Sequence, residues 1–281
     1  MIPQCLYLCT FHLRRTVKSV PNIIVLAKQV FYTQYLRIDR ANKKIITEGV
    51  SRVISESDKH AVEEAVRLKE KHGGKITVLT LGPPESKEAL REAIAMGADE
   101  GYMLSGPEFE NSDAHASAIA LAAAIRKVGQ FDMVLCGETS EDQYSFQVGP
   151  RIAERLSLPQ ITYAVKIALE DGKVVVDRNL EDFYETVESR LPVFVTVSRE
   201  INEPRLPTLM AIMAASKKPM TSWTAGDIGL APSKIGRKGS LTESVRSAVA
   251  AGERKRVLLK VEPKEAAERL AAALVSEGVV K

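Results

Sequence analysis

Apolar residues follow two alternating patterns from Ile23 onward: short continuous runs, and longer segments with helical spacing. The apolar runs lie at residues 23–27, 76–81, 101–104 and 133–136. Their length and continuity are typical of strands that are buried on both faces of a sheet. The segments with helical spacing surround Ala61, Ala65 and Leu68 and cover residues 86–96, 114–128 and 147–156. This alternation predicts βαβ units, and therefore an α/β fold with a doubly wound, mostly parallel sheet and helices on both faces. Ser57 or Asp58 is the expected cap of the first helix, which should end at Gly73.

The rhythm changes after Pro159. Strand-like segments follow one another at residues 162–169, 173–179, 184–190 and 193–197. Asp171 and Gly172 form the expected hairpin turn between the first two, so the four segments predict an antiparallel extension of the parallel core. A smaller hairpin is predicted from residues 36–39 and 44–46.

Beyond Glu200 the pattern weakens. A short helix is predicted from Thr208, and residues 216–240 are too rich in Gly, Ser and Lys to form a core of their own. A last amphipathic helix is predicted at residues 263–277. It fits an extended C-terminal arm that crosses to another subunit, or an arm that docks on its own chain.

The composition of the 281 residues, 45% hydrophobic and 27% charged, is that of a soluble globular protein. The net charge is only +3 with both signs interspersed, which argues against nucleic-acid binding. No apolar run approaches the roughly 18 to 20 residues of a membrane-spanning helix, so no membrane insertion is expected. The three cysteines, Cys5, Cys9 and Cys136, fit a reducing compartment and predict a cytoplasmic location. The histidines are scattered, so no metal site is expected.

Residues 1–22 differ from the rest of the chain, because they combine Cys, His, Arg and Lys without a clear period. We interpret them as an extension peculiar to this chain or as the product of an upstream start codon. A transit peptide is the alternative, since acidic residues are absent from the segment.

The most informative segment covers residues 132–150. A strand-like run breaks at Gly137 into a polar, acidic loop, and a helix is predicted to begin near Gln147. Ligands of open α/β sheets bind at the carboxyl ends of strands, and the amides at a helix start favour a phosphate group. The segment therefore predicts a nucleotide site, although an ordinary connection between strand and helix would give the same pattern.

Three loops should converge on that ligand, because each follows a predicted parallel strand. They are residues 26–28, residues 81–83 and residues 137–149. Glycines let backbone amides approach a pyrophosphate, so Gln147 and Gly149 should face the phosphate. Leu26 and Leu81 would offer apolar surface to adenine, or serve only as core residues.

Motifs for other chemistry are absent from the sequence. It contains no Gly-x-Gly-x-x-Gly after a strand, no Walker-type Gly-Lys-Ser/Thr and no nucleophile elbow. Glu138, Glu141 and Asp142 are candidate general acids or bases, but loop carboxylates are more often solvated or structural. We therefore assign no catalytic residue and expect a bound nucleotide to supply the chemistry.

Several ordered motifs give the chain a family resemblance from about Ile23 to Lys281. They are Val25-Leu26-Ala27-Lys28-Gln29-Val30, residues 61–71, Gly82-Pro83, residues 95–99, Gln147-Val148-Gly149-Pro150, Leu191-Pro192-Val193 and Asn202-Glu203-Pro204-Arg205. On these motifs the chain resembles the β subunit of electron transfer flavoprotein. The resemblance implies a heterodimer with an α subunit, and transfer of electrons between flavins.

The resemblance also implies a set of cofactor-binding residues. They are Leu26, Ala27, Lys28, Ser55, Asp58, Leu81, Gly82, Pro83, Cys136, Gly137, Glu138, Thr139, Asp142, Gln143, Tyr144, Ser145, Phe146, Gln147, Val148, Gly149 and Pro150. Two positions depart from the family pattern. Ser55-Glu56 replaces a usual Asn-Pro pair, and Asp142-Gln143-Tyr144 replaces an Asp-Gly-Asp-like loop, which puts the family's contacts there in doubt.

Family members hold either AMP or a second FAD at this site. AMP-binding chains tend to have Thr-Gly-Gln where this chain has Val148-Gly149-Pro150, which is similar to the FAD-binding, NADH-oxidising branch. Valine lacks the hydroxyl donor of threonine and leaves more space, so we favour FAD over AMP, with NADH as substrate and electron bifurcation as the activity. Ferredoxin is then a candidate low-potential acceptor.

One further residue is implied by the resemblance. Leu209 matches a leucine of the family's recognition loop, which docks into a partner dehydrogenase or quinone oxidoreductase. The resemblance divides the chain into an N-terminal extension (1–22), a nucleotide-binding α/β domain (23–205), a recognition-like loop and linker (206–240) and an arm that contacts the partner subunit (241–281). An adenine-nucleotide sensor, or a structural subunit with an empty crevice, are the alternatives from other classes.

Overall fold

The computed structural model describes residues 21–39, 42, 44–170, 172–245 and 256–280. The N-terminal extension and Asp171 of the expected turn thus lie outside the described residues, apart from residues 21 and 22. The described chain forms two compact units. The smaller unit consists of residues 38–45 and 247–281, as far as they are described, and the larger unit contains the rest.

The larger unit is built on a nine-stranded sheet with the order β11-β10-β9-β12-β8-β1-β6-β7-β13. The strands are β1 (Asn22–Leu26), β6 (Lys75–Leu81), β7 (Glu100–Leu104), β8 (Met133–Gly137), β9 (Gln160–Glu170), β10 (Lys173–Leu180), β11 (Phe183–Arg190), β12 (Val193–Val197) and β13 (Met220–Trp223). In this order, every neighbouring pair from β9 through β12, β8, β1, β6 and β7 to β13 is parallel. The pairs β9–β10 and β10–β11 are antiparallel.

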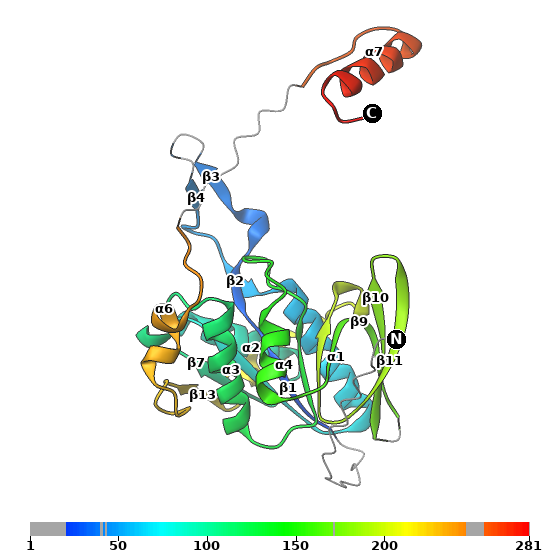
Figure 1. Cartoon of the computed structure of the whole chain (residues 1–281). Helices are drawn as coiled ribbons and strands as arrows, with labels where there is room; N and C mark the ends of the chain where they lie inside the picture. The colour runs from blue at the N-terminus through cyan, green and yellow to red at the C-terminus, as the bar shows by residue number, and fades with distance from the viewer. Residues whose placement is uncertain (1–20, 40–41, 43, 171, 246–255, 281) are drawn as a thin grey trace, which may run out of the picture. The chain divides into compact units, whose positions relative to one another are not determined.

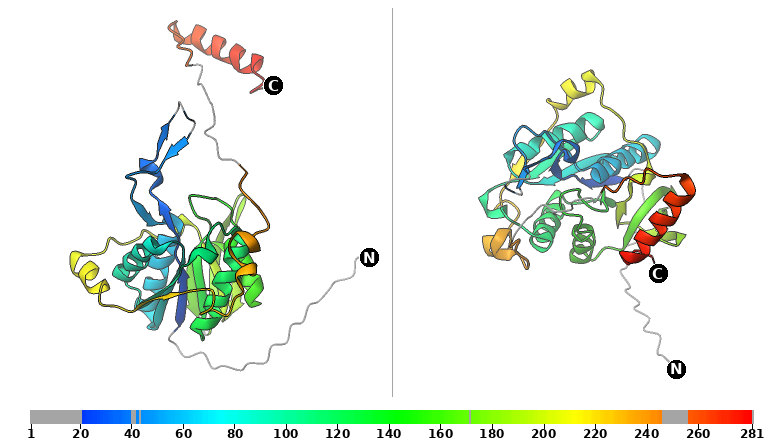
Figure 2. Two further views of the ribbon diagram at one scale, coloured as in Figure 1. Left: turned by 90° about the vertical axis from the view of Figure 1, so that its left-hand side faces the viewer. Right: turned by 90° about the horizontal axis from the view of Figure 1, so that it is seen from above.

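Helices cover both faces of the sheet (Figures 1 and 2). The helices α1 (Glu56–His72) and α2 (Lys87–Met96) pack on one face, and α3 (Ala114–Val128) and α4 (Val148–Leu156) pack on the other. Successive side chains of a strand point to opposite faces, so Ile23 and Val25 of β1 join the first core while Ile24 and Leu26 join the second. This double burial explains the continuous apolar runs, and the predicted α/β fold is confirmed.

The extension after residue 159 is only partly as predicted. Strands β9, β10 and β11 form an antiparallel meander, but β12 returns into the parallel core between β9 and β8. All five residues of β12 are buried, which a strand at the centre of a two-sided sheet requires. The prediction that this segment belongs to the antiparallel extension was therefore wrong.

Strand β13 was not predicted from the sequence. It lies in the polar segment 216–240 and extends the sheet at its edge by pairing with β7. The indole of Trp223 stacks on the ring of Tyr102 with 4.2 Å between ring centroids, and the ammonium of Lys127 lies 5.0 Å from the indole. Ala225, Ile228 and Ile235 of the same segment are buried in the core on the α3–α4 side of the sheet, so the segment adds to that core instead of forming its own.

Besides several single-turn 3-10 helices, the remaining strands and α-helices of the described chain are short, except for the last helix. They are β2 (Gln29–Phe31), β3 (Arg37–Asp39), β4 (Lys44–Ile46), β5 (Arg52–Ile54), α5 (Leu209–Ala215), α6 (Gly236–Gly239) and α7 (Pro263–Ser276). Strand β2 pairs with β5, and β3 pairs with β4 in the predicted small hairpin. None of the described helices is both long and apolar enough to cross a membrane.

Candidate functional site

The carboxyl ends of the parallel strands enclose a cavity of about 790 Å³. Strand order reverses at β1, because the chain first adds β6 and β7 on one side and then places β8 on the other. Such a switch point leaves a crevice between neighbouring loops, where α/β proteins bind their ligands. The loops after β1, β6, β7 and β8 and the start of α4 line the cavity.

Most residues of the predicted site line this one cavity. They are Leu26, Ala27, Lys28, Asp58, Leu81, Gly82, Pro83, Cys136, Gly137, Glu138, Thr139, Asp142, Gln143, Ser145, Phe146, Gln147, Val148 and Gly149. Three predicted residues lie outside the lining: Ser55 is buried before α1, Tyr144 is 55% exposed, and Pro150 lies within α4. That these side chains bind a nucleotide remains a prediction.

The sequence did not point to the loop after β7. This loop contributes Ser105, Gly106, Pro107, Phe109, Glu110, Asn111 and Ser112 to the lining. The rule that selected the other loops also applies here, since β7 is a parallel strand whose carboxyl end faces the same edge. Turn and helix-start signals do follow Leu104, namely Gly106-Pro107 and the α3 cap Asp113, which accepts from the backbone N–H of Ala116 at 2.9 Å, but the prediction of the site did not include them.

Asp58 joins the ends of the two strands at the switch point. Its Oδ2 accepts a hydrogen bond from the backbone N–H of Lys28 at 2.8 Å, and its Oδ1 accepts one from that of Gly137 at 2.8 Å. Burial raises the pKa of this carboxyl to about 7, against the two amide hydrogen bonds, which favour the charged form. Asp58 therefore fixes the spacing between two cavity loops.

The start of α1 is capped in a way that the sequence did not predict. We expected Ser57 or Asp58 as the cap, but α1 begins at Glu56, and neither side chain bonds the first-turn amides. The carboxylate of Glu141, from the loop after β8, accepts from the backbone N–H of Glu56 at 3.0 Å. Glu141 also pairs with Arg199 at 3.1 Å, so its carboxylate serves as a structural group rather than a general base.

A charged pair lies at the rim of the cavity. The ammonium of Lys28 contacts the Asp142 carboxylate at 2.6 Å and the Ser140 hydroxyl at 3.3 Å. Both charged side chains are more than a third exposed. The pair connects the loop after β1 with the loop after β8, and it leaves the lysine within reach of an anion in the cavity.

Two glycines allow close approach at the site. A Cβ on Gly137 would lie 2.5 Å from the Cβ of Ser57, so only glycine lets α1 come this near to the end of β8. A Cβ on Gly149 would lie 2.9 Å from Cγ2 of Thr196, so α4 also packs against β12 too closely for any residue but glycine. Both contacts bring helix starts to the cavity.

Polar groups in the lining suit an oxygen-rich ligand. Thr80 and Thr139 each have a buried side-chain hydroxyl without a hydrogen-bond partner among the described residues. The cap residue of α4, Gln147, makes no side-chain bond to the first-turn amides, so these donors remain open. The residues present therefore fit a phosphorylated cofactor, whose oxygens would accept from these groups.

The ionisable groups in the cavity do not form a catalytic set. Burial raises the pKa of Glu138, and burial raises that of the Cys136 thiol well above its usual value, so the thiol stays protonated at neutral pH. No described histidine lines the cavity. The lining can bind and orient a ligand, and a bound cofactor would supply the reactive atoms.

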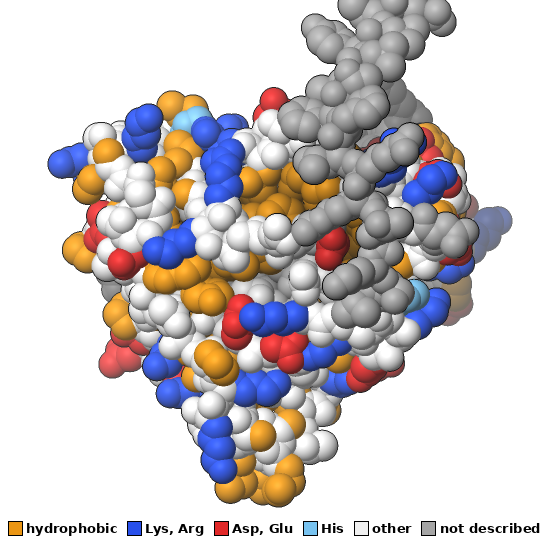
Figure 3. Space-filling view, turned by 90° about the horizontal axis from the view of Figure 1, so that it is seen from below, with side chains coloured by type: hydrophobic (Ala, Val, Ile, Leu, Met, Phe, Trp, Pro, Cys, Tyr) orange, Lys and Arg blue, Asp and Glu red, His pale blue; other side chains and the backbone are white. Residues whose placement is uncertain are grey.

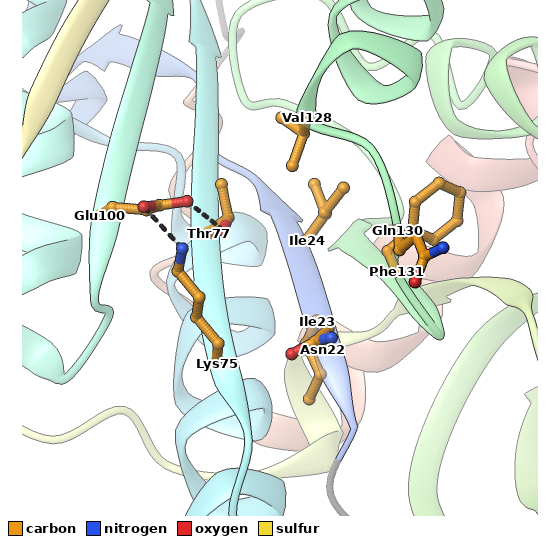
Figure 4. Close-up of a pocket in the computed structure, with 9 residues that line it drawn as sticks. All are labelled: Asn22, Ile23, Ile24, Lys75, Thr77, Glu100, Val128, Gln130 and Phe131. Atoms are coloured by element: carbon orange, nitrogen blue, oxygen red, sulfur yellow. Dashed lines mark hydrogen bonds and ion pairs between the residues drawn. The ribbon is translucent and has the colours of Figure 1, made fainter. Parts of the chain in front are cut away.

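A second, smaller cavity lies at the other end of the sheet. It measures about 190 Å³, and its polar side chains bond one another: Glu100 accepts from Lys75 at 2.7 Å and from the Thr77 hydroxyl at 3.0 Å (Figure 4). At this end of the molecule, charged side chains of both signs are interspersed with hydrophobic ones (Figure 3). Within the described chain, the smaller cavity therefore offers no comparable set of unpaired donors.

The predicted docking residue is exposed. Leu209 begins α5 and is 73% exposed, and its neighbours Leu206, Met210 and Met213 are exposed as well. Thr208 caps this helix through a hydrogen bond from the backbone N–H of Ala211 at 3.2 Å. An apolar, solvent-facing helix of this kind fits a transient interface, although docking itself remains a prediction.

Comparison with known proteins identifies the family. Residues 43–228 match the electron transfer flavoprotein domain. The electron transfer flavoprotein subunit beta of Thermoanaerobacterium thermosaccharolyticum is 44% identical over 92% of this chain and 100% of its own length. Subunit CarD of the caffeyl-CoA reductase-Etf complex of Acetobacterium woodii is 42% identical over 80% of this chain and 86% of its own. The corresponding beta subunit of Clostridium acetobutylicum is 41% identical over 80% and 87%. The chain therefore belongs to the electron transfer flavoprotein family, among the relatives of its beta subunits.

Proposed function

We propose that this chain is the β subunit of a heterodimeric electron transfer flavoprotein and binds FAD in the cavity at the switch point. The observation that carries the proposal is the cavity itself, which spans the ends of β1, β6, β7 and β8. Its volume of about 790 Å³ lies in the upper part of the roughly 300–1,000 Å³ range of ligand pockets.

The extent of the cavity favours FAD over AMP. FAD consists of an AMP moiety joined to a flavin mononucleotide, so it needs a lining that continues beyond the adenosine and its phosphate. The cavity reaches from Leu26 after β1 to Ser105 and Asn111 after β7. Val148 at the start of α4 also lacks the hydroxyl that a phosphate contact would use, in agreement with a different cofactor pose.

The chain's own residues would bind and orient this cofactor. The open amides at the start of α4 and the amides of the loop after Gly137 would hold the diphosphate, with Lys28 as the nearby cation. Leu26 and Leu81 would give apolar contacts to adenine, and the Thr80 and Thr139 hydroxyls would bond polar atoms of the cofactor. A bound flavin would supply the redox chemistry, because it can accept a hydride from NADH and release single electrons.

The exposed surface of the C-terminal helix favours the presence of a partner subunit. Helix α7 has no buried residue, and Leu270 and Val275 are 52% and 59% exposed. A lone helix of this length is marginal in water, so an exposed apolar face needs a packing partner. We assign this face to an α subunit, which would carry the other flavin and lie near the reactive ring of FAD in this chain.

The proposed activity is bifurcating electron transfer. NADH would reduce the FAD of this chain, one electron would pass to the α-subunit flavin, and the other would pass to a low-potential acceptor such as ferredoxin. The exposed Leu209 surface would dock a partner dehydrogenase or quinone oxidoreductase. A reducing cytoplasmic location agrees with these partners.

Counting cofactors tests the proposal. The chain should be co-expressed with its α subunit, the complex denatured, and the released nucleotides quantified. We expect FAD in excess of the flavin of the α subunit, no AMP, and bleaching of the flavin absorbance by NADH without oxygen. One flavin with AMP and no bleaching would replace this proposal by the AMP-binding type, and no nucleotide at all would point to a purely structural subunit.

A matched pair of valine variants tests whether the cofactor binds in the cavity. Thr139→Val removes a buried hydroxyl that has no partner in the described chain, and Thr77→Val removes one that already bonds Glu100. We expect Thr139→Val to weaken retention of the cofactor by roughly five- to tenfold, since a hydrogen bond contributes about 1 kcal/mol. Thr77→Val should lower stability and leave cofactor content unchanged.

A further inference from the structure

Helices α3 and α4 pack side by side (Figure 1). A cluster of basic side chains lies on the surface of this helix pair. His115 belongs to the first turn of α3, and Arg151 and Arg155 belong to α4. All three are half-buried. Because Arg151 and Arg155 are four residues apart on one helix, their side chains project from the same face. We call these three residues the α3–α4 basic cluster.

The two guanidinium groups converge on one imidazole. Nη1 of Arg151 lies 3.5 Å from Nδ1 of His115, and Nη2 of Arg155 lies 3.4 Å from Nε2 of the same ring. A neutral imidazole has one acceptor nitrogen, while the other nitrogen carries a hydrogen. One guanidinium therefore faces a donor whichever tautomer is present, and the cluster holds more donors than acceptors.

No carboxylate balances this charge within the described part of the chain. Arg151 and Arg155 form no ion pair there, and Glu154, the neighbouring acid on α4, is exposed and forms none either. Among the described residues, the only acceptor of Arg151 apart from the ring is Oε1 of Gln147, at 2.9 and 3.1 Å. Oε1 is neutral, so the positive charges remain uncompensated.

We propose that the α3–α4 basic cluster binds a phosphoryl group. A compact anion suits it better than a broad acidic surface, because both guanidinium groups lie beside the same imidazole ring. Phosphate oxygens accept several hydrogen bonds at once and would supply the missing acceptors. The site is separate from the cavity but close to its rim, because Gln147 both lines the cavity and bonds Arg151. The inference does not depend on the identity of the cofactor in the cavity.

The test uses the full chain as purified, with its cofactor and any partner subunit that it retains. Inorganic phosphate and ADP are titrated separately, and the ring signals of His115 are followed by NMR, with His115→Gln used to assign them. We expect both probes to shift the His115 signals in a saturable manner. Tighter binding of ADP than of phosphate would identify a nucleoside phosphate as the source, and equal affinity would identify free phosphate.

Charge-matched variants separate the site from general attraction. Arg151→Gln and Arg155→Gln should each weaken binding about tenfold or more, as expected when a charge-assisted hydrogen bond is lost. Arg91→Gln removes the same charge from an exposed position of α2 on the other face of the sheet, where Arg91 already pairs with Glu88, and should leave binding unchanged. Equal weakening by all three variants, or His115 signals that do not move, would overturn the proposal.

Discussion

Replacing Asp58 by asparagine should change how the stability of this protein depends on pH. Asp58 is buried, its two oxygens bond the amides of Lys28 and Gly137, and its pKa is raised from 3.8 to about 7. Besides burial, the negative charge of Glu141 raises this pKa, whereas the positive charge of Lys28 lowers it. An asparagine side chain at this position would keep one acceptor oxygen but cannot ionise.

The sign of the effect follows from proton binding. Between pH 3.8 and about 7 the folded state keeps a proton on Asp58 that the unfolded state has lost, so stability falls as the pH rises through this range. Raising the pKa from 3.8 to about 7 corresponds to about 4 kcal/mol of stability in total, at about 1.4 kcal/mol for each pH unit. The contribution of Asp58 to stability is fully present below pH 3.8, the pKa of Asp58 in the unfolded chain, and it is lost above about pH 7.

Urea unfolding between about pH 5 and pH 8 measures this dependence. The free energy of unfolding of the wild type, relative to Asp58→Asn, should fall by about 3 kcal/mol across that range, because the effect operates from pH 5 up to the raised pKa of about 7. Asp113→Asn is the control. The pKa of Asp113 is lowered to about 2, so both its folded and unfolded values lie below the range, and its difference from wild type should stay constant. A constant difference for Asp58→Asn as well would refute the reasoning.

Two further substitutions test the packing and the charges around the site. Gly149→Ala places a Cβ 2.9 Å from Cγ2 of Thr196 and should lower the free energy of unfolding by about 1–3 kcal/mol, whereas Gly226→Ala meets no atom closer than 3.7 Å and should change it little. Equal effects of the two alanines would contradict the crowding argument. Arg205→Ala removes a 2.8 Å ion pair from the buried carboxylate of Glu63. Breaking a buried ion pair completely costs roughly 3–5 kcal/mol. Because Arg67 still bonds Glu63, we expect the free energy of unfolding to fall by only about 2 kcal/mol. Urea unfolding measures both, and an unchanged Arg205→Ala midpoint would exclude this role for the pair.

The layered core could be predicted from the sequence because each strand buries both faces. Continuous apolar runs such as residues 133–136 became β8, and helical spacing at residues 114–128 gave the observed bounds of α3. Strand β12 has the same apolar signature, but its place after three antiparallel strands concealed its parallel pairing. Apolar patterns thus predict burial, whereas the neighbours of a strand depend on contacts distant in sequence.

The candidate site was predictable as a set of loops and not as a set of interactions. The position of each loop follows from the direction of its strand, so Leu81 and Gly137 could be placed at one edge of the sheet. The two hydrogen-bond partners of Asp58 are distant in the sequence: Gly137 is 79 residues away and Lys28 is 30 residues away. Sequence spacing carries no information about such pairs, so the link that Asp58 makes between the strands was not predicted, while its contact with a cofactor remains a prediction.

Of the two helix N-termini at the cavity, that of α4 is better suited to an anionic ligand than that of α1. Helices α1 and α4 both begin beside the loop after β8, and each has amides that the helix itself cannot satisfy. The carboxylate of Glu141 already bonds the amides of Glu56 and Ser57, so an anion at α1 would meet a like charge. The start of α4 has no side-chain cap, and its positive dipole end remains available. An anionic cofactor should therefore be oriented with its phosphates toward α4 rather than toward α1.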